Sequence, residues 1–402
     1  MELVKRDCAI CSSSNIKQVY EQPTYFILGI GDIHYVHRIA ICKECGFVFA
    51  SPILPSEVIS QYYRRLSNYE NPQYGGENSP EDKSKFDRTH KFIKSRLPAG
   101  FKGKALDIGC GVAFGLSLFQ LDGWEVTGLD PSPKCAELSR ELYGVRVETG
   151  MYNKEALVSE GPYDLIILSH VLEHVSSPDL LTHELREILA RNGLLYIEVP
   201  NLLRPYVPVG YFTFEHLNYF TPITLTSLME KNGFSADHLE TFDNSADIHP
   251  FYPVIASTWK MTTTTPSPRL RNDYVDADRI IEKYREESQQ QIERLQARID
   301  LILATVKPGR LGVWGAGIHT SQLLSLTALS RASLACIFDN DTKKHGARIN
   351  GVEVVPFPGH PEQVNALVDA IVISSKASEN EIYKQLSYLK EFGIEVYKLY
   401  DV

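Results

Sequence analysis

The chain has 402 residues, a net charge of −9, 43% hydrophobic residues and 23% charged residues. It is too long for one ordinary hydrophobic core, so we expect several domains. The acidic balance argues against a nucleic-acid binder, because phosphates are neutralised by clustered Lys and Arg. No run approaches the roughly 20 apolar residues of a membrane span, and the N-terminus has no apolar signal core. We therefore expect a cytoplasmic globular protein without nucleic-acid or membrane partners, either a monomer or a homodimer.

Residues 1–62 contain two C-x-x-C pairs, Cys8 with Cys11 and Cys42 with Cys45. Four thiolates close a tetrahedron around Zn2+ and leave no open coordination position, so the pattern predicts a metal-binding domain with a structural zinc ion. Disulfides are the competing interpretation, which a cytoplasmic location disfavours. An iron–sulfur cluster for radical chemistry would usually bring a third nearby cysteine.

The middle of the chain alternates between strand-like and helical patterns. Residues 63–95 are polar and rich in tyrosine, which indicates a linker followed by the start of a helix. From 96 to 245 the strand-like runs are 104–110, 124–130, 145–150, 163–169 and 193–200. This order predicts a parallel, doubly wound sheet of the α/β class.

A glycine-rich turn, ALDIGCGVAFG, covers residues 105–115. Gly109 and Gly111 let the backbone pass close beneath a ligand at a helix N-terminus, and Asp130 ends the next strand, where a carboxylate binds the hydroxyls of a ribose. Such a turn alone is weak evidence, since several nucleotide cofactors use one. Asp107 discriminates, because an acid there repels a pyrophosphate but suits the cationic amino-acid end of S-adenosylmethionine (SAM). We expect Met151 near the adenine.

Two polar stretches follow the later strands. In GPYDLIILSHVLEHV, the side chains of His170, Glu173 and His174 are expected at the end of the fourth strand, with His170 over the cofactor. In FEHLNYF, residues 214–220, Glu215 stands beside His216 among aromatic residues. A helix-capping turn with buried aromatics accounts for part of this stretch, but it does not require an acid beside a histidine.

The last part of the chain predicts a long helix and a second α/β domain. Residues 271–305, within an expected connector 246–305, contain neither Pro nor Gly and are rich in helix formers. Residues 306–402 alternate again, and VWGAGIHTSQLL at 313–324 is a dinucleotide-type turn with Asp339 after the next strand. We expect this Rossmann-like domain to help hold the substrate. A second redox cofactor and a scaffold or dimerisation role are the alternatives.

The region 96–245 resembles class I SAM-dependent methyltransferases at its glycine turn, at Asp107 and Asp130, and at HVLEH. The order of zinc module, SAM domain with an E-H-x-x-x-F element and C-terminal α/β domain resembles the sugar C-methyltransferases of deoxysugar biosynthesis. This resemblance implies a transferase that methylates a nucleotide-linked 4-keto-6-deoxy sugar. It also implies that Glu215 and His216 are the catalytic pair, with His216 as the base.

The chemistry implied by this resemblance is consistent with the residues. A ketone acidifies the neighbouring C–H bond, and a histidine poised near neutral pH suits the base that removes the proton. His174 and Tyr69 are the candidates for contacts to the oxygens of the substrate, with Tyr62, Tyr63 and Tyr74 as rivals of Tyr69.

The chain departs from the family pattern at Thr213, where members often carry Tyr. An O- or N-methyltransferase that acts on a sugar or small metabolite is therefore the alternative. A non-catalytic SAM- or sugar-nucleotide-binding regulator is the second alternative.

Overall fold

The computed structural model describes residues 2–28, 31–66, 80–158, 160–205, 210–242, 253–262, 271–376 and 378–400. The chain divides into two compact units. The first unit comprises residues 1–20, 38–206 and 215–282, and the second comprises 21–37, 207–214 and 283–402. Among the described residues, no helix has both the length and the apolar character that crossing a membrane requires.

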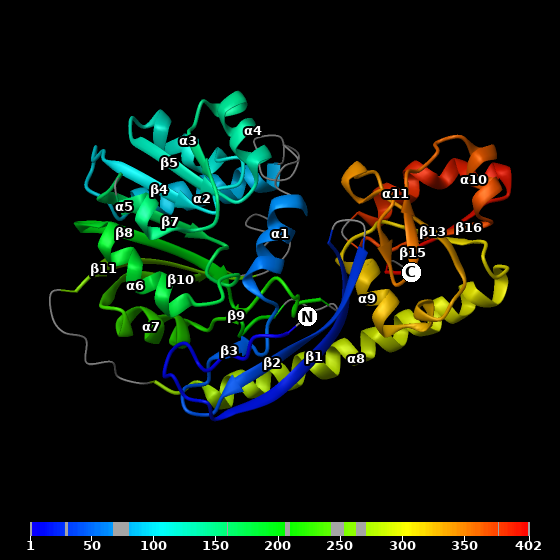
Figure 1. Ribbon diagram of the computed structural model, residues 1–402, viewed down its shortest axis with the longest axis horizontal. Helices are drawn as coiled ribbons and strands as arrows, with labels where there is room; N and C mark the ends of the chain where they lie inside the picture. The colour runs from blue at the N-terminus through cyan, green and yellow to red at the C-terminus, as the bar shows by residue number, and fades with distance from the viewer. Residues whose placement is uncertain are drawn as a thin grey trace. The chain divides into compact units, whose positions relative to one another are not determined.

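The first unit is built on a seven-stranded sheet with the order β10-β11-β8-β7-β4-β5-β6 (Figure 1). The strands are β4 Lys104–Ile108, β5 Glu125–Asp130, β6 Val147–Thr149, β7 Tyr163–Ser169, β8 Leu189–Pro200, β10 Phe234–Phe242 and β11 Val254–Met261. Strands β4 to β8 run parallel, whereas β11 is antiparallel to both β8 and β10. The parallel, doubly wound sheet expected from the sequence is confirmed.

Helices cover both faces of this sheet because alternate side chains of each strand point to opposite faces. Leu106 packs in one core cluster together with the apolar faces of α6 Pro178–Ile188 and α7 Pro222–Lys231. Its neighbour Ala105 packs in another cluster. Three helices contribute to that second cluster: α2 Pro80–Lys94, α3 Phe114–Leu121 and α4 Pro133–Tyr143. The short helix α5 Lys154–Val158 adds Leu157 to the first cluster.

The sheet extends beyond the boundary that we expected at residue 245. Strand β11 lies in the expected connector 246–305, yet it pairs with β8 and is therefore an internal strand of the sheet. Its residues Val254–Trp259 are all buried. A strand that is buried on both faces has no polar–apolar alternation, which is why the sequence pattern did not reveal it.

A smaller sheet with the order β1-β2-β3-β9 follows the first cysteine pair, and the second pair begins at the last residue of β2 (blue in Figure 1, except β9). Its strands are β1 Ile16–Leu28, β2 Gly31–Cys42, β3 Val48–Ala50 and β9 Asn218–Tyr219. Strand β9 belongs to the FEHLNYF stretch and pairs with β3, with Val48 opposite Tyr219. The helix α1 Ser56–Leu66 follows and crosses the boundary that we expected at residue 62.

The second unit contains a six-stranded sheet with the order β14-β15-β13-β12-β16-β17. The strands are β12 Leu311–Trp314, β13 Leu334–Phe338, β14 Arg348–Ile349, β15 Val352–Val355, β16 Ala370–Ile373 and β17 Glu395–Tyr397. Helices α9 Ile318–Leu326, α10 Pro361–Leu367 and α11 Glu379–Leu386 alternate with them. The long helix α8 Tyr274–Thr305 precedes this sheet in the chain, close to the expected range 271–305.

Candidate active site

The glycine turn after β4 is tied to the end of β5 by backbone hydrogen bonds. Gly109 and Gly111 have φ values of 74° and 55°, a region that disfavours side chains with a Cβ. The Gly109 N–H donates to the Leu129 carbonyl at 2.7 Å. The Asp130 carboxylate accepts from the N–H of Gly111 at Oδ2 and from the N–H of Ser132 at Oδ1, both at 2.9 Å. The turn therefore holds Asp130 in one orientation at the carboxyl ends of the strands.

Two buried acids make this edge of the sheet suited to a cation. Burial and the neighbouring Asp130 raise the pKa of Asp107 to about 8, against the opposing charge of Lys85. Burial also raises the pKa of Asp130, although the N–H groups of Ser132 and Gly111 lower it. A positively charged ligand beside these carboxyl groups would favour their ionised forms. This agrees with the predicted SAM site at Asp107, Gly109, Gly111 and Asp130, which stays a prediction.

Helix α2 packs over the start of α3. The Phe86 ring lies edge-on to Phe114 with centroids 5.5 Å apart, and a Cβ at Gly115 would come within 2.7 Å of Phe86. Two residues further, Arg88 pairs with the buried Glu198 of β8 at 2.8 Å. The sequence analysis did not single out Glu198. The sequence feature that could have revealed Glu198 is its position inside the apolar strand GLLYIEVP, because a buried acid needs a partner.

His170 lies between two buried carboxylates. It has a φ of 57°, its Nδ1 is 3.1 Å from Glu173 Oε1, and its Nε2 is 3.3 Å from Glu198 Oε1. Burial lowers the pKa of His170, but the two carboxylates prevail and raise it above its usual value. Glu173, although buried, has its pKa lowered to about 2, chiefly by its hydrogen bond from His170. His170 is thus a buried partner of two acids, and its predicted contact with the cofactor stays a prediction.

The FEHLNYF stretch docks on the turn after β7. The N–H groups of Leu217 and Asn218 donate to the Glu173 carbonyl at 2.6 and 3.0 Å. The Asn218 amide donates to the carbonyls of Leu172 and Val175 at 2.9 and 2.7 Å. These bonds fix residues 217–218, and through them His216, beside HVLEH.

His216 and His174 face each other in this arrangement. Their rings are 4.8 Å apart at an interplanar angle of 77°. The Nδ1 atom of His174 lies 2.8 Å from the Tyr63 hydroxyl and 2.9 Å from the Glu215 carbonyl. Two histidines and a tyrosine, all partly exposed, thus converge at the carboxyl end of β7.

The Glu215 side chain has a hydrogen-bond partner in helix α1. Its Oε1 accepts from the Tyr62 hydroxyl at 2.6 Å. Burial and Glu215 raise the pKa of Tyr62 well above its usual value, so Tyr62 keeps its proton. Tyr62 and Tyr63 are the rivals of Tyr69 that reach this region, whereas Tyr69 and Tyr74 lie outside the described residues. Met151 is described and exposed.

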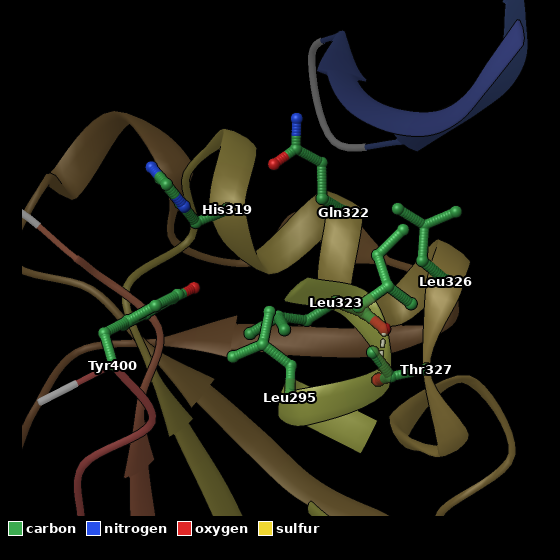
Figure 2. A pocket seen from close by; sticks show the side chains of 8 residues that line it. Leu295, His319, Gln322, Leu323, Leu326, Thr327 and Tyr400 are labelled. Atoms are coloured by element: carbon green, nitrogen blue, oxygen red, sulfur yellow. Dashed lines mark hydrogen bonds between the residues drawn. The ribbon is translucent and has the colours of Figure 1, made fainter. Parts of the chain in front are cut away.

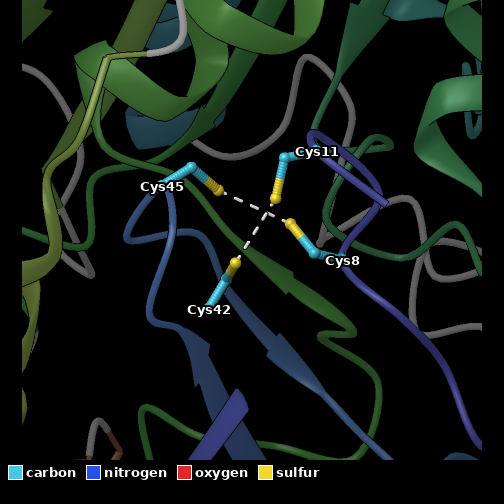
Figure 3. A group of neighbouring side chains, drawn as sticks. All are labelled: Cys8, Cys11, Cys42 and Cys45. Atoms are coloured by element: carbon cyan, nitrogen blue, oxygen red, sulfur yellow. Dashed lines mark hydrogen bonds between the residues drawn. The ribbon is translucent and has the colours of Figure 1, made fainter. Parts of the chain in front are cut away.

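The four cysteines of the two C-x-x-C pairs come together in one cluster (Figure 3). The sulfur atoms of Cys8 and Cys45 are 3.5 Å apart, as are those of Cys11 and Cys42. Sulfurs at roughly 2.3 Å from a tetrahedral zinc ion are separated by about 3.8 Å, so the cluster fits the ion. The turn is tightly packed, because a Cβ at Gly46 would come within 2.3 Å of the Tyr274 backbone.

The second unit contains a pocket beside α9 (Figure 2). It is lined by Ile292, Leu295, His319, Gln322, Leu323, Leu326, Thr327 and Tyr400. Its volume of about 10 Å³ is close to the minimum that holds one water molecule. It is therefore no site for a nucleotide.

Comparisons with known proteins find similarity in the middle of the chain. Residues 80–239 match the family described as "Methyltransferase domain". The "Ubiquinone biosynthesis O-methyltransferase" of Pelagibacter ubique is 25% identical over 179 residues, which are 40% of this chain and 70% of that protein. The "C-methyltransferase NovU" of Streptomyces niveus is 20% identical over 334 residues, which are 81% of this chain and 76% of that protein.

Among solved structures, the 1,6-didemethyltoxoflavin-N1-methyltransferase of Burkholderia thailandensis is 17% identical, covers 60% of this chain and 99% of its own, and has a TM-score of 0.41. The family match spans the glycine turn, Asp130 and the turn after β7, and it coincides with most of the seven-stranded sheet. Residues 80–239 therefore carry a methyltransferase domain, and the sheet that they build has the doubly wound order of the class I SAM-dependent methyltransferase fold.

Proposed function

We propose that the chain is a SAM-dependent C-methyltransferase that acts on a nucleotide-linked 4-keto-6-deoxy sugar in the cytoplasm, with His216 as the general base. The observation that carries the proposal is the docking of residues 217–218 on the Glu173 carbonyl, which holds His216 against His174 at the carboxyl end of β7. Strand β7 is the neighbour of β4, whose Asp107 faces Ile167 in the register. The base and the acidic turn thus belong to the same edge of the sheet.

The roles of the residues follow from the chemistry. SAM would supply the methyl group, with its cationic end at Asp107 and its ribose hydroxyls at Asp130. His216 takes the proton from the carbon beside the ketone, and the enolate carbon then forms a bond to the methyl group while the sulfur keeps the bonding electrons. We expect His174, which contacts the Tyr63 hydroxyl and the Glu215 carbonyl, to bind an oxygen of the substrate.

The extent of the similarity favours carbon over oxygen as the acceptor. The protein named as a C-methyltransferase is similar over 81% of this chain, whereas the ubiquinone O-methyltransferase is similar over 40%. O-methylation of a small metabolite remains the second candidate, because several relatives of that name are similar to the methyltransferase domain.

Deuterium exchange separates the two candidates. Purified protein is incubated in D2O with a panel of nucleotide-linked 4-keto-6-deoxy sugars, first without SAM and then with it. The masses of the sugars are then measured by mass spectrometry. We expect one sugar to take up deuterium beside the ketone and then to gain a methyl group. Loss of the base should slow both steps in His216→Ala by roughly 100-fold or more.

His183→Ala is the matched control, because His183 is an exposed histidine of α6. It should behave like the wild type. Methylation without deuterium uptake would indicate an oxygen or nitrogen acceptor. No change in any sugar, with SAM binding intact, would overturn the proposal.

We also infer that the four-cysteine cluster holds a structural zinc ion. Replacing the metal with Co2+ should give an intense thiolate-to-cobalt charge-transfer band, and Cys42→Ser should lose this band and unfold at a lower temperature. Cys336→Ser, a buried cysteine of the second unit, is the control that should keep the band. A wild-type protein with these thiols paired as disulfides would overturn the inference.

A further inference from the structure

We propose that Glu173, His174 and His216 form a second metal site, for a divalent first-row transition-metal ion such as Zn2+. One oxygen and two nitrogen ligand atoms of these residues lie within 4.8 Å of one another. Two imidazoles and a carboxylate form a donor set that binds such ions in preference to Mg2+ or Ca2+. Three protein ligands leave coordination positions open for water or an oxygen of the substrate. The proposal goes beyond the proposed function, because ion binding requires no particular methyl acceptor.

The carboxylate of Glu173 is prepared for a cation. The residue is 1% exposed, and its Oε1 accepts from His170 Nδ1 at 3.1 Å. Its Oε2 is buried, and no described residue donates a hydrogen bond to it. A buried carboxylate oxygen without a hydrogen-bond donor is costly, and a metal ion at this atom would satisfy it. His170, itself 3.3 Å from Glu198, fixes the orientation of the carboxylate.

The orientation of His174 also points to an ion. The Glu215 carbonyl, 2.9 Å from Nδ1, can only accept a hydrogen bond, and the Tyr63 hydroxyl at 2.8 Å can donate or accept, so a proton on this nitrogen satisfies both contacts. The other ring nitrogen, Nε2, lies 3.9 Å from Glu173 Oε1. A metal ion between these two donor atoms would bind both of them. Metal-binding histidines commonly donate their other N–H to a carbonyl in this way.

The third ligand is held by the backbone. The hydrogen bonds from Leu217 and Asn218 to the Glu173 carbonyl tie His216 to the residue that supplies the carboxylate. The His216 ring meets His174 nearly at right angles, with centroids 4.8 Å apart. All three ligands lie in the first unit and come from two segments joined by main-chain bonds, so the site is largely formed before an ion enters.

The proposed ion and the proposed base use the same side chain. His216 cannot bind an ion through a ring nitrogen and remove a proton with it at the same time. A loaded site would instead offer the ion's open positions to the ketone or hydroxyl of the substrate. The metal-loaded and metal-free proteins should therefore differ in activity, and the binding test below does not depend on which of them is active.

Titration with Co2+ alone tests the site, because the two kinds of ligand give different spectra. Full-length protein freed of metal should bind two equivalents. The four-cysteine cluster gives a thiolate charge-transfer band, whereas a site without sulfur gives only weaker visible bands. We expect Glu173→Gln, His174→Ala and His216→Ala each to lose the sulfur-free equivalent and to keep the thiolate band, which also reports that the protein is folded.

His183→Ala should bind both equivalents. A wild-type protein that shows only the thiolate band would overturn the proposal and indicate a shared proton between Glu173 and His174. Retention of the sulfur-free bands in all three variants would overturn it as well. Failure of the proposed function would appear separately, as absence of methyl transfer in both metal-loaded and metal-free protein.

Discussion

The two α/β sheets of this chain share one arrangement of hydrogen bonds at their glycine turns, but the charged residues around the turns differ. After β4, the Gly109 N–H donates to the Leu129 carbonyl at 2.7 Å, and after β12 the Gly315 N–H donates to the Phe338 carbonyl at 2.7 Å. Asp130 and Asp339 follow those carbonyls, and each accepts backbone N–H groups with both carboxylate oxygens. The turns are thus built alike.

The residues around the two turns differ in charge. In the first sheet Asp107, two residues before Gly109, adds a second buried acid beside Asp130. In the second sheet the corresponding position is Val313, and Lys344 lies 3.4 Å from Asp339. The first turn therefore favours a cationic ligand, and the second already balances its carboxylate. A glycine turn by itself does not specify a cofactor, and the acid before it carries the information.

Removal of the acids that cap the turns should give the largest difference. Asp130→Ala is expected to weaken SAM binding roughly 10- to 100-fold, because charge-assisted hydrogen bonds to the ligand and to the turn are both lost. Asp339→Ala removes the same two backbone contacts in the second sheet and should leave SAM affinity unchanged. Isothermal titration calorimetry measures both. Equal losses in the two variants would break the comparison.

The pH dependence of SAM binding should sharpen the comparison of the two turns further. The pKa of Asp107 is raised to about 8 without ligand, and a cationic ligand requires the ionised form, so affinity should rise by up to about tenfold per pH unit below that value and then level off. Asp107→Asn should bind SAM weakly with little dependence on pH. A flat profile in the wild type would contradict the assignment.

The same ionisation affects stability with the opposite sign. Because the folded pKa lies above the usual value, the folded protein holds a proton that the unfolded chain releases. The contribution of Asp107 is therefore greatest at acidic pH and is lost as the pH rises towards about 8. Denaturant unfolding of wild type and Asp107→Asn across this range should show a smaller decline for the variant.

The smallest effect concerns the glycines that begin the turns. Gly109 has a φ of 74° and Gly315 a φ of 100°, so an alanine at either position should cost about 1 to 2 kcal/mol of unfolding free energy. Only Gly109→Ala should also weaken SAM binding, because its Cβ would come within 2.6 Å of Val171, next to His170. Chemical denaturation and calorimetry separate the two effects. Loss of SAM affinity in Gly315→Ala would be inconsistent with the comparison.

Local sequence patterns determined much of this protein. The cysteine pairs, the two glycine turns with their following acids and the long helix 274–305 occupy the elements that we expected. These features can be read because each depends on residues close together in the chain, where spacing and side-chain type constrain the backbone directly.

Only the tertiary structure decided which distant residues meet. Tyr62 reaches Glu215 across 153 residues and Tyr63 reaches His174 across 111 residues, although the sequence analysis favoured Tyr69 over both. The place of β11 beside β8 and the pairing of Glu198 with Arg88 and His170 are equally non-local. The physical reason is that buried charges and internal strands take their partners from the packing of the whole fold, which no short window of the sequence contains.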